Sequence, residues 1–150
     1  MDSADRQLAA FIAKYAPPIA AQASEILARM AIRLPTAHRL VYDNYNALAV
    51  GFSPDDRSSN GILSIAVYPR WISLFFLQGV SLDDPDGILK GQGSQVRHIV
   101  LTGPDDLDRP DIVAMIERAL AAAKTPLPAS GAGPLIIKSV SARQRPRRPA

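Results

Sequence analysis

Three basic residues and two glycines near the middle of the chain have the chemistry of an anion-binding site. Arg70 precedes a polar loop, Lys90 lies within it and Arg97 follows it. Gly91 and Gly93 would let backbone N–H groups approach a phosphate or carboxylate closely, because glycine has no side chain to block them. An aromatic side chain at the start of the preceding apolar run would complete the site. The predicted ligand-binding residues are Arg70, Trp71, Lys90, Gly91, Gly93 and Arg97.

The same loop has a second interpretation, because it also carries three acidic residues. Asp83, Asp84 and Asp86 precede the glycines in the chain. Opposite charges this close in sequence commonly form ion pairs. The carboxylates would then neutralise the cations, and the loop would be a closed clasp without a ligand.

The C-terminal residues are strongly basic. The chain has seventeen basic and fourteen acidic residues, and five of the basic residues but none of the acidic ones follow Pro134, so the first 134 residues carry a net charge of −2. A mobile cationic arm can bind nucleic acid by releasing counterions from phosphates. The alternative is a solubilising extension without a partner. The residues predicted to contact nucleic acid are Arg143, Arg145, Arg147 and Arg148.

No motif in the chain is a catalytic signature. His38 and His98 have no nucleophilic serine of the G-x-S-x-G type to act with. Gly91-Gln92-Gly93 lacks the third glycine and the following helix of a dinucleotide-binding fingerprint. The acidic residues lie at turns and helix starts, where Asp is common without a metal. We therefore expect neither a cofactor nor a metal and a non-catalytic protein, with acid–base chemistry by an Asp or His in a cleft as the alternative.

The spacing of apolar residues predicts an α+β fold. Helical spacing indicates two N-terminal helices, separated by Pro17 and Pro18, and a helix after Asp108. Alternating or continuous apolar runs with short connections indicate an antiparallel sheet of about five strands, with the helices packed on one face. The predicted strands cover residues 40–42, 46–52, 62–68, 71–77 and 97–101.

Length and composition favour one domain followed by a tail. Residues 1–125 are long enough to bury a sizeable core. Residues 126–134 have the composition of a flexible linker, 135–140 are either an added edge strand or unordered, and the basic end is expected to be disordered.

The chain has no Cys, no basic and apolar leader, and no apolar run of membrane-spanning length. We therefore expect a cytoplasmic protein with no membrane partner.

One stretch resembles a known family. Residues 71–85 read W-x-S-L-F-F-L-Q-G-V-x-L-x-D-P, and residues 87–99 read G-I-L-K-G-x-G-x-Q-V-R-H-I. This pattern resembles the YdhG-like family of small bacterial domains of unknown function, over about residues 10–123. The resemblance implies a helix-flanked antiparallel sheet. Some members are described as frataxin-like iron chaperones, which would imply iron handling through surface carboxylates.

Three functions follow as hypotheses. The preferred one is a non-catalytic module that binds a small anionic molecule or a protein around residues 71–97. The alternatives are an iron chaperone, as the resemblance implies, and a nucleic-acid accessory protein that acts through the basic tail.

Overall fold

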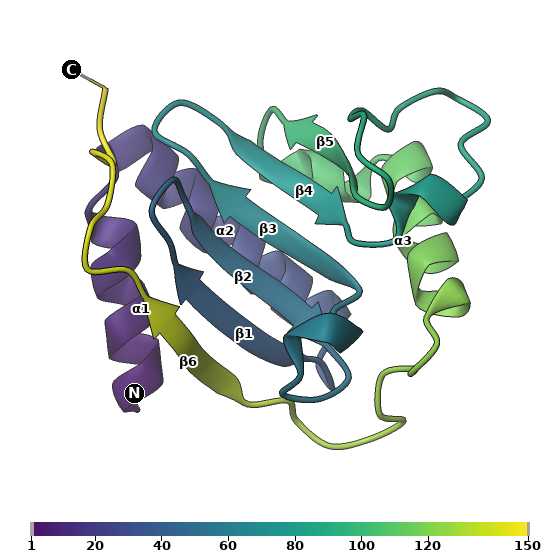
Figure 1. Ribbon diagram of the computed structural model, residues 1–150, viewed down its shortest axis with the longest axis horizontal. Helices are drawn as coiled ribbons and strands as arrows, with labels where there is room; N and C mark the ends of the chain where they lie inside the picture. The colour runs from purple at the N-terminus through teal and green to yellow at the C-terminus, as the bar shows by residue number, and fades with distance from the viewer. Residues whose placement is uncertain (1, 150) are drawn as a thin grey trace.

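The computed structural model describes residues 2–149, which form an α+β fold, as the sequence predicts (Figure 1). Three short 3-10 helices, η1 (Ser58–Asn60), η2 (Gly79–Ser81) and η3 (Pro104–Asp108), lie in the connections. The three α-helices are α1 (Ser3–Ala13), α2 (Pro17–Arg33) and α3 (Pro110–Ala122). The six strands are β1 (His38–Asp43), β2 (Leu48–Ser53), β3 (Leu63–Val67), β4 (Ile72–Phe76), β5 (Arg97–Leu101) and β6 (Leu135–Val140).

The six strands form one mixed sheet in the order β5-β4-β3-β2-β1-β6. Strands β1 to β5 are an antiparallel meander, while β6 pairs with β1 in parallel. The prediction of about five strands, all antiparallel, is therefore approximate. After α3 the chain crosses from the β5 side to the opposite edge of the sheet (Figure 1), and a parallel neighbour needs such a long connection.

One glycine lets the chain enter the sheet at β6. A Cβ atom at Gly133 would lie 1.8 Å from the backbone oxygen of Ala37, far inside van der Waals contact. The backbone N–H of Gly133 donates to the Pro35 oxygen over 3.0 Å, and the N–H of Arg39 donates to the Pro134 oxygen over 2.9 Å. This close approach sets the register of β6 against β1.

The core joins alternate residues of the strands to the apolar stripes of the helices. Val50, Ile65 and Leu74 lie on adjacent strands in register and are at most 1% exposed. They belong to one buried cluster with residues of all three α-helices, and Figure 1 shows α2 behind the sheet. The buried hydroxyl of Tyr15 adds a polar link, because it donates to the Val67 oxygen over 2.6 Å and accepts from the Leu48 N–H over 3.1 Å.

The C-terminal residues differ from the predicted disordered tail. Residues 135–140 form β6, and the backbone N–H groups of Ser141 and Arg145 donate to the oxygens of Asp43 and Tyr45 over 2.9 and 2.8 Å. Arg147 is 5% exposed. Composition could not reveal this docking, because it depends on a buried carboxylate of β1. None of the helices in residues 2–149 is long and apolar enough to cross a membrane.

Candidate functional site

The glycine-bearing loop holds part of the predicted anion site together, but its arginine already has partners. Lys90 and His98 exchange backbone hydrogen bonds of 2.8 and 2.9 Å, which ties the loop to β5. The guanidinium of Arg97 donates to the backbone oxygens of Gly93 and Val96 over 2.6 and 2.8 Å. Arg97 therefore closes the loop, and its charge is directed at carbonyl groups of the chain itself.

The other two predicted residues lie at the opposite end of β4. Arg70 and Trp71 precede Ile72, which pairs with Leu101, whereas Arg97 pairs with Phe76. Four residues of strand separate the two ends, about 13 Å. Trp71 is exposed and stacks on Tyr68, with 4.7 Å between the ring centroids. The structure thus does not bring the six predicted residues together.

The clasp interpretation is not observed either. The carboxylate of Asp84 accepts hydrogen bonds from the backbone N–H groups of Ile88 and Leu89, over 2.9 and 3.0 Å. Among the described residues, the loop acids form no ion pair with Arg70, Lys90 or Arg97. Asp84 is a turn-stabilising residue here, as Asp often is.

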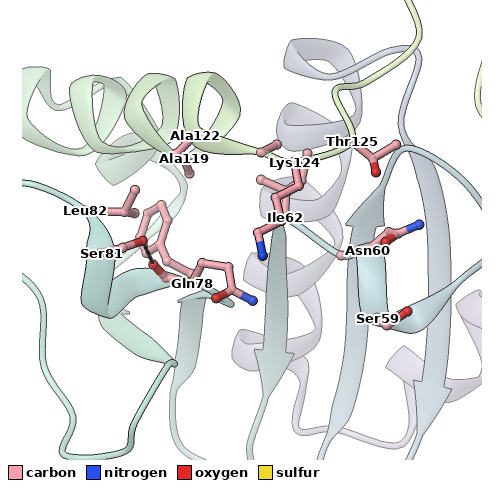
Figure 2. Close-up of a pocket in the computed structure, with 13 residues that line it drawn as sticks. Ser59, Asn60, Ile62, Gln78, Ser81, Leu82, Ala119, Ala122, Lys124 and Thr125 are labelled. Carbon is pink, nitrogen blue, oxygen red and sulfur yellow. Dashed lines mark hydrogen bonds between the residues drawn. The ribbon is translucent and has the colours of Figure 1, made fainter.

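A pocket of about 230 Å³ opens where three distant segments meet (Figure 2). The segments are residues 59–62 around the end of η1, residues 76–82 from the end of β4 through η2, and residues 119–125 at the end of α3. The apolar lining consists of Ile62, Phe76, Leu82, Ala119, Ala122 and Ala123. The polar lining consists of Ser59, Asn60, Gln78, Ser81, Lys124 and Thr125.

Local sequence explains how the lining is held. Pro126 disfavours helical geometry at the residue before it, so α3 ends nearby and releases Lys124. A Cβ atom at Gly79 would lie 2.5 Å from the Arg97 Cβ, so only glycine lets η2 pack this closely against the start of β5. The hydroxyl of Ser81 donates to the Gln78 oxygen over 2.9 Å and fixes the turn. These constraints place Gln78 opposite the end of α3.

The pocket is electrostatically unbalanced. Among the described residues that line it, Lys124 is the one charged side chain and none is a carboxylate. In Figure 2 the Lys124 side chain extends from the end of α3 into the pocket, towards the side chain of Gln78. In the described part of the chain, Lys124 has no hydrogen-bond or ion-pair partner. The Asn60 amide donates to the Asp55 carboxylate over 2.8 Å. An apolar floor with one ammonium and the amide of Gln78 suits a small amphipathic anion.

Sequence reasoning found only part of this pocket. Phe76 belongs to the predicted strand at residues 71–77, and Gln78 directly follows it. Asn60 and Lys124 are not among the predicted site residues, because each is an ordinary residue for a turn or a helix end. No local signal marks them, since the pocket exists only when the three segments fold together.

A buried carboxylate anchors the C-terminal residues. Asp43 is fully buried, and its two oxygens lie 2.7 Å from Lys14 Nζ and 3.0 Å from Arg147 Nη2. Arg147 Nη1 and Nη2 also donate to the backbone oxygens of Tyr45 and Asn44. Burial raises the pKa of Asp43, but the hydrogen bonds from Lys14 and Arg147 outweigh it, so the pKa lies below its ordinary value. Arg147 is therefore a structural residue.

The acidic residues of η3, which iron handling through surface carboxylates could use, have other partners. Arg29 lies 3.0 Å from Asp105, and Arg33 lies 3.2 Å from Asp108. The carboxylate of Asp106 accepts from the backbone N–H and the hydroxyl of Thr102. Within residues 2–149, no group of three or more His, Asp or Glu side chains is arranged to hold a metal ion.

The two histidines are far apart in the sheet. His38 begins β1 and His98 lies in β5, with three strands between these two strands. The His98 ring packs against Phe75, with 5.3 Å between the centroids. The two rings therefore do not form a shared site.

Comparison with known proteins yields no relative. No protein-family model, no curated protein and no solved structure matches this chain.

Proposed function

We propose that this protein is a non-catalytic binding module for a small organic anion with an apolar body. The observation that carries the proposal is the ammonium of Lys124, which has no partner among residues 2–149 and is directed into a pocket with an apolar floor and no carboxylate in its described lining. The apolar part of the ligand would pack on Phe76 and Leu82. Its carboxylate would lie near Lys124, within reach of the Gln78 amide.

The volume of the pocket limits the ligand. At about 230 Å³ it is smaller than the sites that enclose drug-sized molecules. A single aromatic or short aliphatic carboxylate matches this space better than a nucleotide does. The YdhG-like resemblance stays a hypothesis supported by residues 71–99, and the iron chaperone hypothesis gains no observation from the acidic residues.

A titration with two matched probes tests the charge preference. Benzoate and benzyl alcohol have similar shapes, but only benzoate is charged. We expect millimolar benzoate to shift the backbone amide resonances of residues 78–82 and 119–125, and benzyl alcohol to bind more weakly. Lys124→Gln should weaken benzoate binding by up to about fivefold, the size of an exposed ion pair, and leave benzyl alcohol binding unchanged.

Two further variants separate this pocket from the glycine-bearing loop. Ala122→Leu should fill the pocket and abolish the shifts for both probes. Lys90→Gln removes an exposed lysine at the loop and should leave benzoate binding unchanged. If Lys90→Gln weakens benzoate binding and Lys124→Gln does not, the loop is the anion site and the proposal is wrong.

A further inference from the structure

The C-terminal segment after β6 is a fixed basic surface. We call residues 141–148 the basic strap. The Lys14 Nζ donates to the Gln144 Oε1 over 3.0 Å, and the Arg148 Nε donates to the Lys14 backbone oxygen over 3.2 Å. With the strap's backbone bond to Tyr45, these contacts hold the strap against the end of α1 and the β1–β2 turn. Figure 1 shows the segment, in yellow, running past the end of α1.

The charges of this surface are almost all of one sign. Lys14, Arg143, Arg145 and Arg148 are exposed, while the carboxylate of Asp43 beneath them is fully buried. The side chains of Arg143 and Arg145 form no hydrogen bond or ion pair with the residues that the structure describes. Asp43 pairs with both Lys14 and Arg147, so these three groups together keep one net positive charge, while Arg143, Arg145 and Arg148 have no counterion among the described residues.

We propose that the basic strap and Lys14 together bind the phosphodiester backbone of a nucleic acid. Arginine donates to phosphate in a planar, bidentate geometry, and bound cations release counterions from the backbone. Because the strap is already ordered, binding does not carry the entropic cost of ordering a free arm.

The surface favours a duplex over a single strand. Single-strand binders stack successive bases on several aromatic rings. Tyr45 is the exposed aromatic residue that contacts the strap, and it is 47% exposed. One ring and four cations are suited to backbone contacts without base recognition.

Arg147 has a different role from its neighbours. Its side chain is 3% exposed and forms an ion pair with Asp43. Arg147 therefore anchors the strap and does not contact the ligand. This assignment divides the four arginines of the tail into one anchor and three contact residues.

Salt-dependent binding of a short DNA duplex, followed by fluorescence anisotropy, tests the proposal. Four phosphate contacts predict a slope of log K against log salt of about −3.6. Combined replacement of Arg143, Arg145 and Arg148 by Gln should reduce the slope to about −1 and weaken binding at least tenfold at low salt. The matched control replaces Arg57, Lys90 and Arg118 by Gln, which removes the same charge from the opposite end of the sheet and from α3 and should keep the slope.

The anchor is tested by Arg147→Met. Losing the anchor should release the strap, so affinity should fall severalfold while the salt slope stays the same, since the contact residues remain. Folding of the variant is checked by circular dichroism, and binding is measured at a temperature where it is folded. Affinity equal to that of the natural chain would overturn the claim that the surface is preformed.

Three results would overturn the proposal. The first is an equal loss of binding in the matched control, which would assign the effect to net charge. The second is tighter binding of a single strand of the same length. The third is equal binding, with the same salt slope, of polyglutamate or of phosphatidylglycerol vesicles, which would identify the partner as another polyanion.

Discussion

Replacing Asp43 with Asn should lower the free energy of unfolding by about 3 to 5 kcal/mol, the cost of breaking a buried ion pair by removing one partner. The variant leaves the Arg147 guanidinium, with its side chain 3% exposed, without a carboxylate. For a chain of this length the loss corresponds to a fall in Tm of about 10 °C. Thermal and urea denaturation measure both quantities.

Asp56→Asn is the matched control, because Asp56 is exposed and forms no ion pair in residues 2–149. It should change the free energy of unfolding by no more than about 0.5 kcal/mol. If both substitutions have the same small effect, the Asp43 network does not stabilise the fold.

The buried Asp43 carboxylate also makes the stability of the protein depend on pH. The pKa of Asp43 is lowered in the folded protein, so its contribution is present above the pKa of the unfolded chain and is lost as the pH falls through the lower folded value. The free energy of unfolding of the natural chain should therefore fall more steeply below about pH 4 than that of Asp43→Asn. Urea denaturation across this range measures the difference, and parallel curves would contradict it.

Gly133→Ala should destabilise the protein by about 3 kcal/mol, the upper end of the range for overpacking. The added Cβ atom would lie 1.8 Å from the Ala37 oxygen and 2.3 Å from its carbonyl carbon. Both atoms belong to the backbone, so β6 has to move away from β1. Hydrogen exchange should show the earliest loss of protection at the amides of residues 135–140, and urea denaturation should give the loss in stability.

Gly93→Ala is the control for this substitution. A Cβ atom at Gly93 meets no other atom within 4 Å. Its free energy of unfolding should stay within about 0.5 kcal/mol of that of the natural chain. An equal loss for both variants would point to a general effect of glycine in the unfolded chain and not to the contact at Ala37.

The helices and the meander follow from local patterns. The apolar run at residues 71–77 contains β4, and alternating apolar residues mark β2 and β3, because one face of each strand is buried. Prolines mark the boundary between α1 and α2, since proline is tolerated at the first turn of a helix. The place of β6 does not follow from its sequence, because its pairing depends on an edge formed by β1 about one hundred residues earlier.

The residues of the candidate sites also fall into two groups: those that local sequence brings together and those that only the fold brings together. Gly91, Gly93 and Lys90 do lie around one loop, as their proximity in sequence predicts. Local sequence could not separate Arg70 and Trp71 from that loop, because the separation depends on the direction of β4. It could not select Lys124 either, since the pocket brings residue 124 to residues 60 and 78 only through packing.

The sequence by itself determined the type and order of most elements, the acidic body and the basic C-terminal end, because periodicity and charge are properties of short segments. Only the tertiary structure decided the sixth strand, the pocket at Lys124 and the docking of Arg147 on Asp43. Each of these joins groups that are far apart in the chain. Their stabilisation comes from burial and from charge pairing, which exist only once the sheet has formed.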